Sequence, residues 1–213
     1  MAHNGRMLGV IGGSGFYSFF GSDARAISLD TPYGSPSAPI TVGAVGDHEV
    51  AFLPRHGVRH EFSPHTVPYR ANMWAMRALG VRRIFAPCAV GSLTPRLGPG
   101  AMVVIQGPRF STRAESRWFA SQGFTLVNMT GYPEAVLARE LEMCYAAIAL
   151  VTDLDAGIES GEGVRAVDVF AEFEKNLVPF KKLVHEAIDQ VAVERTCTLC
   201  LPHDGVELPF DLP

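Results

Sequence analysis

The chain has 213 residues, of which 47% are hydrophobic and 19% charged, and its formal net charge is −4. This length and composition predict one globular domain with a sizeable core. The negative charge gives no basis for binding nucleic acid or an anionic membrane. The longest apolar runs, such as Ala146–Val151, are too short to cross a bilayer, and residues 1–6 lack the apolar segment of a signal peptide. We therefore expect a cytosolic protein.

Predicted strands and helices alternate along the chain. Apolar runs bounded by turn residues predict strands over Met7–Ile11, Ile40–Val45, His48–Leu53, Arg83–Ala86, Thr125–Asn128 and Tyr145–Val151. Apolar residues at helical spacing predict helices over Tyr69–Leu79, Thr112–Ser121, Pro133–Met143 and Ala166–Val191. The last helix should break or kink at Pro179, and its apolar stripe, which begins with Phe170 and Phe173, should lie in the core.

This alternation predicts an α/β fold, with a single domain built on a mixed central β-sheet flanked by helices. The domain should span residues 1–193, with an irregular tail over residues 194–213.

A glycine-rich turn follows the first predicted strand. Gly12-Gly13-Ser14-Gly15 fits neither the dinucleotide fingerprint nor the P-loop, and taken alone it indicates only a tight turn. A second turn, Pro54-Arg55-His56-Gly57, carries a guanidinium suited to phosphate and a histidine that can add a donor. Alone, it could equally be a solvated basic loop. Together, the two turns favour an oxyanion site in which Arg55 makes a bidentate contact with phosphate.

Other polar or small residues also follow predicted strands. Cys88–Gly91, Met129-Thr130 and Asp153 each come at such an end. Ligands of α/β proteins bind beyond the carboxyl ends of the strands, so these residues should share one site with the glycine turn. For Asp153-Leu154-Asp155 alone, a polar strand end would be the simpler interpretation.

The cysteines do not indicate a disulfide scaffold. Cys88 and Cys144 lie in apolar stretches and are predicted to be ordinary buried thiols. Cys197 and Cys200, with His203 nearby, resemble half of a zinc site. A second cysteine pair is missing, so the sequence favours a structural tail with no metal.

Six motifs occur in an order typical of a known family. They are Gly12–Gly15, Pro54–Gly57, Pro64–Asn72, Gly107–Ser116, Asn128–Thr130 and Thr152–Asp155. In this set the chain resembles the methylthioadenosine/purine nucleoside phosphorylase family over most of residues 7–190. Its Pro87–Leu93 stretch and Cys197/Cys200 tail are most similar to actinobacterial members.

The resemblance implies a nucleoside phosphorylase-like fold, a homotrimer, and phosphorolysis of S-methyl-5′-thioadenosine with inorganic phosphate as co-substrate and no cofactor. It implies phosphate binding by Ser14, Arg55, His56 and Thr130, and substrate binding by Cys88, Ala89, Phe110, Met129, Asp153 and Asp155. Asp153 would protonate the departing base at N7, since a buried carboxyl can be a general acid near neutrality. Asp155 would accept from a 6-amino group, so 6-aminopurines should be preferred.

One departure from the family pattern lies near residues 104–106. The chain passes from Leu97–Gly100 to Gln106–Phe110 through one Met-Val-Val strand, where the family has two such strands with about 30–50 residues between them. Losing a βα unit should leave neighbouring strands with unpaired backbone groups, and so lower stability, trimer formation and turnover. Two alternatives therefore stand beside the methylthioadenosine activity: a general purine nucleoside phosphorylase, and a catalytically impaired relative that only binds nucleoside or phosphate. A product that does not fold is a further possibility.

Overall fold

The computed structural model describes residues 7–21, 23–95, 100–157, 163–201, 207 and 211–213. Its centre is one eight-stranded sheet with the order β2-β3-β4-β1-β5-β7-β6, and β8 pairs with β5 beside this path. The strands are β1 (Leu8–Gly12), β2 (Arg25–Ile27), β3 (Ile40–Val45), β4 (His48–Pro54), β5 (Arg83–Ser92), β6 (Met102–Val104), β7 (Leu126–Asn128) and β8 (Cys144–Leu154). Parallel and antiparallel pairs both occur, so the predicted mixed sheet is confirmed.

The helices lie close to their predicted positions. They are α1 (Tyr69–Ala78), α2 (Arg113–Ser121), α3 (Gly131–Glu140) and α4 (Ala166–Asp189), and a short 3-10 turn, η1, covers Asp155–Gly157. A capping box between Thr112 and Glu115 starts α2, which explains why this boundary was readable from the sequence.

The predicted break at Pro179 is wrong, because α4 continues through this residue. A proline removes one helical hydrogen bond. The buried side of α4 spans that point, with Phe173 before it and Phe180, Val184 and Ile188 after it, and this packing holds the helix together.

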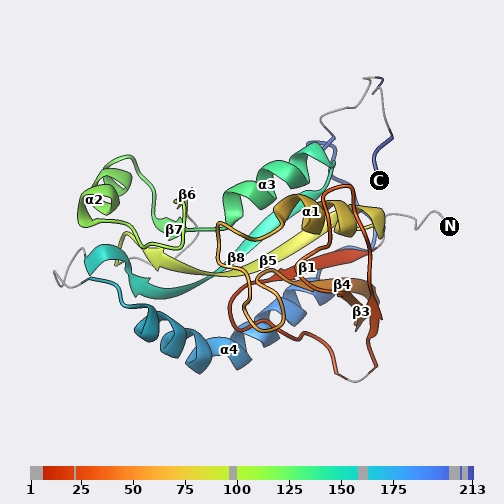
Figure 1. The fold of residues 1–213 in the computed structure, drawn as a ribbon, viewed down its shortest axis with the longest axis horizontal. Coiled ribbons are helices and arrows are strands. Elements are labelled where there is room, and N and C mark those ends of the chain that lie inside the picture. Colours follow the sequence, from red (N-terminus) through yellow and green to blue (C-terminus); the bar gives the residue numbers. More distant parts are fainter. Residues whose placement is uncertain (1–6, 22, 96–99, 158–162, 202–206, 208–210) are drawn as a thin grey trace.

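Helices cover both faces of the sheet (Figure 1). α1 and α3 lie on one face, where Met73, Met76 and Ala138 pack with Ile11 and Leu53. α4 crosses the other face, where its apolar side packs with Leu8, Val10 and Phe52. The central strand β1 is buried along its whole length, since it contributes side chains to both cores. None of the helices in the described part of the chain combines the length and the hydropathy that a membrane span requires.

Two expectations about burial need correction. Phe170 was expected in the core, but it is 50% exposed, because it lines an open cavity instead of packing between the helix and the sheet. The strand predicted over Tyr145–Val151 was expected to be buried, but in β8 these residues are only half-buried or exposed. β8 pairs only with β5 among the described strands, and an edge strand has one open side.

The junction near residues 104–106 is bridged by a short strand. β6 pairs in parallel with β7, from Met102 opposite Leu126 to Val104 opposite Asn128. The backbone N–H of Ile105 then donates to the carbonyl oxygen of Asn128 at 2.9 Å. The neighbouring strand is therefore not left unpaired at this point, contrary to the sequence-based expectation. Leu97, Gly98 and Pro99, which precede the junction, lie outside the described residues.

Candidate functional site

A cavity of about 450 Å³ opens at the carboxyl ends of β1, β4 and β8. Its wall also includes the second half of β5 and the loops that precede α2 and α3. All ten residues predicted for the site line this one cavity: Ser14, Arg55, His56, Cys88, Ala89, Phe110, Met129, Thr130, Asp153 and Asp155. The fold therefore brings together six segments that are far apart in the sequence.

Arg55 lies at the floor of the cavity and is 1% exposed. Its Nε and Nη2 donate to the two carboxylate oxygens of Glu134 at 2.5 and 2.9 Å. Nη2 also donates to the carbonyl oxygen of Ile11, and Nη1 to that of Pro87. Four of the five guanidinium N–H groups are thus engaged, which leaves one on Nη1. With one N–H left, Arg55 cannot make the bidentate contact with phosphate that the sequence suggested.

The remaining N–H of Arg55 faces the glycine turn. A Cβ atom at Gly13 would lie 2.8 Å from Arg55 Nη1 and 3.1 Å from the carbonyl oxygen of Pro87. Only glycine lets the turn approach the guanidinium this closely. Ser14 follows at once and is half-buried in the cavity wall. One positive charge, one N–H and one hydroxyl therefore meet at the end of β1.

His56 stands beside Arg55 as a neutral imidazole. Burial, followed by the positive charge of Arg55, lowers the pKa of His56 to about 3. Its Nδ1 lies 2.7 Å from the carbonyl oxygen of Phe62, so Nδ1 carries the proton and donates. Nε2 then offers a lone pair. His56 is thus an acceptor toward the cavity, not the donor that the sequence suggested, and it suits a hydroxyl group or a protonated phosphate oxygen.

Thr130 joins this polar end of the cavity from the start of α3. The side-chain oxygen of Asn128 accepts from the backbone N–H groups of Thr130 and Gly131 at 2.8 and 2.7 Å. The Asn128 amide nitrogen donates to the carbonyl oxygen of Ala89 at 3.1 Å. Through these hydrogen bonds Asn128 links the start of α3 to β5, and it holds Thr130 next to the strand ends.

Asp153 lies at the other end of the cavity. Its Oδ2 accepts from the hydroxyl of Thr152 at 2.9 Å, while its Oδ1 is buried with no hydrogen-bond partner among the described residues. Burial raises the pKa of Asp153 to about 6. A buried oxygen without a partner is costly unless a ligand or a proton satisfies it. The carboxyl group is therefore suited to holding a proton near neutral pH.

Asp155 is oriented by two serines. The hydroxyls of Ser111 and Ser116 both donate to Asp155 Oδ2, and all three side chains are at most 8% exposed. Asp155 Oδ1 faces Gly91. A Cβ atom built at Gly91 would lie 3.3 Å from Asp155 Oδ1 and 2.9 Å from Asp153 Oδ1. Asp153 Oδ1 and Asp155 Oδ1 thus both lie over one glycine, where a planar ligand edge could contact both.

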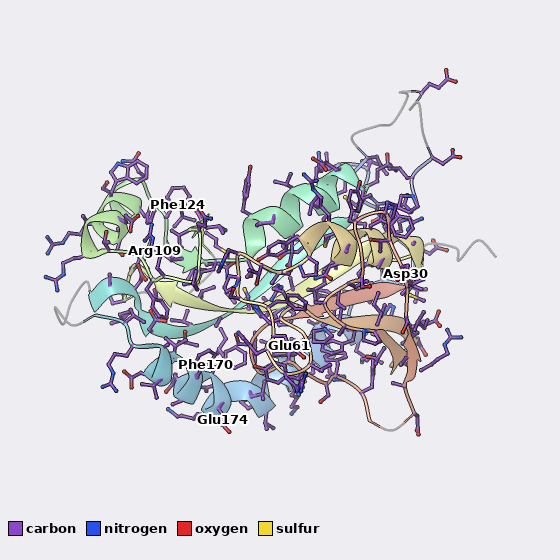
Figure 2. The ribbon with its side chains drawn as sticks, in the orientation of Figure 1. Asp30, Glu61, Arg109, Phe124, Phe170 and Glu174 are labelled. Atoms are coloured by element: carbon purple, nitrogen blue, oxygen red, sulfur yellow. The ribbon has the colours of Figure 1, made fainter. Side chains whose placement is uncertain are left out.

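Apolar groups line the space between the two polar ends. Phe110 and Met129 belong to this wall, as predicted, and burial raises the pKa of the Cys88 thiol to about 11, so that it stays neutral. α4 adds Phe170, whose ring meets the His60 ring edge-on at 6.0 Å. Glu61, which follows His60, and Phe170 both lie below the sheet in the view of Figure 2.

Sequence reasoning missed several residues that shape this site. They are Glu134, which pairs with Arg55; Ser111 and Ser116, which hold Asp155; Asn128, which fixes Thr130; and Phe170 and His60 in the cavity wall. Ser111 and Ser116 belong to the Gly107–Ser116 motif and Asn128 belongs to the Asn128–Thr130 motif, so the sequence carried a signal for these three residues. The sequence carried no such signal for Glu134, since an acidic residue is common in the first turn of a helix without an ion-pair partner.

Comparison with known proteins agrees with this fold. The model of the phosphorylase superfamily matches residues 8–107 and 105–191. The S-methyl-5′-thioadenosine phosphorylase of Mycolicibacterium smegmatis is 69% identical over 258 residues, with 97% of this chain and 100% of that protein covered. The enzyme of the same name from Mycobacterium tuberculosis is 59% identical over 264 residues, with both chains fully covered. The structure of methylthioadenosine phosphorylase from Schistosoma mansoni in complex with adenine has a TM-score of 0.81 and 30% identity, and covers 89% of this chain and 93% of that one.

The same comparisons locate the departure from the family pattern. The alignment with the M. smegmatis protein runs over 258 positions, whereas this chain has 213 residues, so part of that relative has no counterpart here. The two segments matched by the family model meet at residues 105–107, which is the junction that β6 bridges. The chain therefore belongs to the phosphorylase superfamily, within the methylthioadenosine/purine nucleoside phosphorylase family, as a member shortened at this junction.

Proposed function

We propose that this chain cleaves S-methyl-5′-thioadenosine with inorganic phosphate, and that it releases adenine and 5-methylthioribose 1-phosphate. In this reaction a phosphate oxygen forms a bond to C1′ of the ribose while the C1′–N9 bond breaks. The bonding electron pair leaves on the purine, and N7 of the purine takes a proton. Phosphate is thus the nucleophile and a co-substrate, and the reaction needs no covalent enzyme intermediate and no cofactor.

The observation that carries the proposal is the position of Asp153 Oδ1. It is a buried, unpartnered oxygen on a carboxyl group whose pKa is about 6, in the same cavity as Arg55 and His56. A protonated Asp153 can donate to N7 as the base departs. A sugar placed between the two ends would have its developing positive charge next to phosphate, and such placement supplies much of the rate acceleration.

Phosphate would be held by groups of different kinds. Arg55 supplies the charge and one N–H from Nη1, and Ser14 and Thr130 supply hydroxyls. His56 Nε2, an acceptor, fits the protonated oxygen of hydrogen phosphate. The site would therefore bind phosphate in a protonated form, because a fully ionised oxygen facing Nε2 would meet a second lone pair.

The base would lie against Phe110 with its polar edge toward the two aspartates. Ser111 and Ser116 occupy Asp155 Oδ2, so Oδ1 is the oxygen that would accept from an exocyclic 6-amino group. A 6-oxopurine would place an oxygen against this carboxylate. The arrangement therefore supports a 6-aminopurine nucleoside, in agreement with the names of the relatives with 69% and 59% identity.

The test is phosphorolysis by the purified chain with methylthioadenosine, adenosine and inosine side by side. The proposal predicts phosphate-dependent release of adenine from methylthioadenosine and slower cleavage of inosine. Faster cleavage of inosine would point to a general purine nucleoside phosphorylase. A folded chain that binds nucleoside or phosphate in calorimetry but releases no base would instead be the catalytically impaired relative.

We include two further expectations in this proposal: assembly as a homotrimer and action in the cytosol. An exposed aromatic surface between α1 and α3 supports self-association, with Tyr33 54% and Tyr132 66% exposed beside Trp74. Sedimentation velocity tests the assembly, and fractionation of the source cells tests the location. A monomer at micromolar concentration, or recovery with membranes, would contradict the respective expectation.

A further inference from the structure

Three cysteine side chains meet at the end of the sheet opposite the cavity. Cys144 is the first residue of β8, whereas Asp153 lies near the end of the same strand. Cys197 and Cys200 come from the segment that follows α4. The three Sγ atoms all lie within 4.8 Å of one another. None of these cysteines lines the cavity described above.

The tail that carries two of these thiols is held by arginines. Arg83 donates to the carbonyl oxygens of Ala192 and Val193 at 2.5 and 2.9 Å, and Arg195 to that of Cys200 at 3.2 Å. Arg139 Nη1 lies 3.7 Å from Cys200 Sγ. These contacts place the Cys197–Cys200 turn against β8 without any bond between the sulfur atoms, so the cluster is already assembled.

Two arginines stand beside the sulfur atoms. Arg139 Nη1 lies 3.7 Å from Cys200 Sγ, and Arg195 donates to the Cys200 carbonyl oxygen at 3.2 Å. Cysteines bind a metal as thiolates, and these two positive charges would partly offset the negative charge of a thiolate cluster.

We propose that Cys144, Cys197 and Cys200 bind one thiophilic metal ion, Zn²⁺, that fastens the tail to the beginning of β8. Zn–S bonds of about 2.3 Å in a tetrahedral site place the sulfurs about 3.8 Å apart, so only a small inward movement from the observed arrangement is needed. Two cysteines separated by two residues are a common zinc-binding pair, and β8 supplies the third thiolate. The sequence alone favoured no metal, because it does not show that Cys144 lies beside this pair.

The first experiment measures zinc retained by the full-length chain. Tag-free protein, kept reduced and stripped with a chelator, is loaded with Zn²⁺, desalted and analysed for metal by mass spectrometry. We expect about one equivalent for the unaltered chain, as for one structural site. Cys144→Ser and Cys197→Ser should each retain almost none, whereas Cys88→Ala, which changes the remaining cysteine, should retain the full equivalent. Circular dichroism shows that each variant is folded.

The second experiment identifies the ligands. Loading with Co²⁺ should give a thiolate-to-metal charge-transfer band in the near ultraviolet, and this band should weaken in Cys200→Ser and persist in Cys88→Ala. Equal zinc retention by the unaltered chain and the Cys144 and Cys197 variants would overturn the proposal. So would a protein isolated without reductant that shows two free thiols instead of four and binds no zinc after reduction, since the cluster would then be a disulfide site. Neither readout depends on phosphorolysis.

Discussion

Arg55 and Glu134 form a two-point ion pair in which each side chain is only 1% exposed. Glu134 comes from the first turn of α3, and it also accepts from the Tyr145 hydroxyl at 2.7 Å. This carboxylate therefore sets the orientation of the guanidinium and offsets much of its charge. It explains why a cation can be buried at the floor of the cavity.

Replacing Glu134 by Gln should destabilise the fold. The buried charge of Arg55 would lose its counterion, and breaking such a pair costs about 3–5 kcal/mol. Urea unfolding followed by circular dichroism measures the change. Glu186→Gln is the control, because the Lys182–Glu186 pair is 3.6 Å long and exposed and is worth about 0–1 kcal/mol. Equal, small losses in both variants would contradict the structural role given to Glu134.

Replacing Asp153 by Asn should lower turnover by about 10²- to 10⁴-fold, which is the usual contribution of a general acid. The pKa of Asp153 is raised to about 6, so its proton is present below that pH and is lost as the pH rises. The rate for the unaltered chain should therefore fall above about pH 6, and this limb should be absent from the variant.

The change in phosphate ionisation acts on both proteins alike, so the ratio of their rates isolates the aspartate. Asp47→Asn, in the exposed β3–β4 turn, serves as the control and should keep the profile of the unaltered chain. A ratio that does not vary between pH 5 and pH 8 would argue against general acid catalysis by Asp153.

Replacing Asp155 by Asn should move the preference from 6-amino toward 6-oxopurines. Ser111 and Ser116 would still hold the side-chain oxygen, which turns the amide N–H₂ toward the base as a donor. A site built for one hydrogen-bonding pattern rejects the unmatched analogue by up to about 10⁴-fold. The measurement is the ratio of kcat/KM for inosine and methylthioadenosine. An unchanged ratio would mean that Asp155 does not face the 6-position.

The shortened chain should be less stable than a relative of full length. β6 has only three residues, all half-buried, and part of the M. smegmatis protein has no counterpart in this chain. Because domains are stable by only about 5–15 kcal/mol, we expect a melting temperature below that of the M. smegmatis protein and below about 60 °C. Calorimetry of both proteins in one buffer tests this. A sharp transition above that temperature, with turnover matching the relative, would show that the bridge through β6 restores the fold fully.

The sequence by itself determined most of the helices and strands and which segments line the cavity. Turn residues, caps and apolar spacing act over a few positions, so the β3–β4 hairpin, α1 and α2 could be predicted with nearly correct ends. The residues that line the cavity could be predicted because strand ends of an α/β sheet meet at one edge, and because the motifs occur in family order. The junction was also readable, since a repeated strand signature appears only once.

The tertiary structure decided which atoms remain free for chemistry. Arg55 could be predicted in the site, but only its pairing with Glu134, far along the chain, leaves it a single N–H. His56 is an acceptor toward the cavity because its Nδ1–H donates to the carbonyl oxygen of Phe62. Cys144 has two thiol neighbours because the tail folds back on β8. Such pairings depend on contacts between distant segments, and local sequence patterns carry no information about the partner that packing will supply.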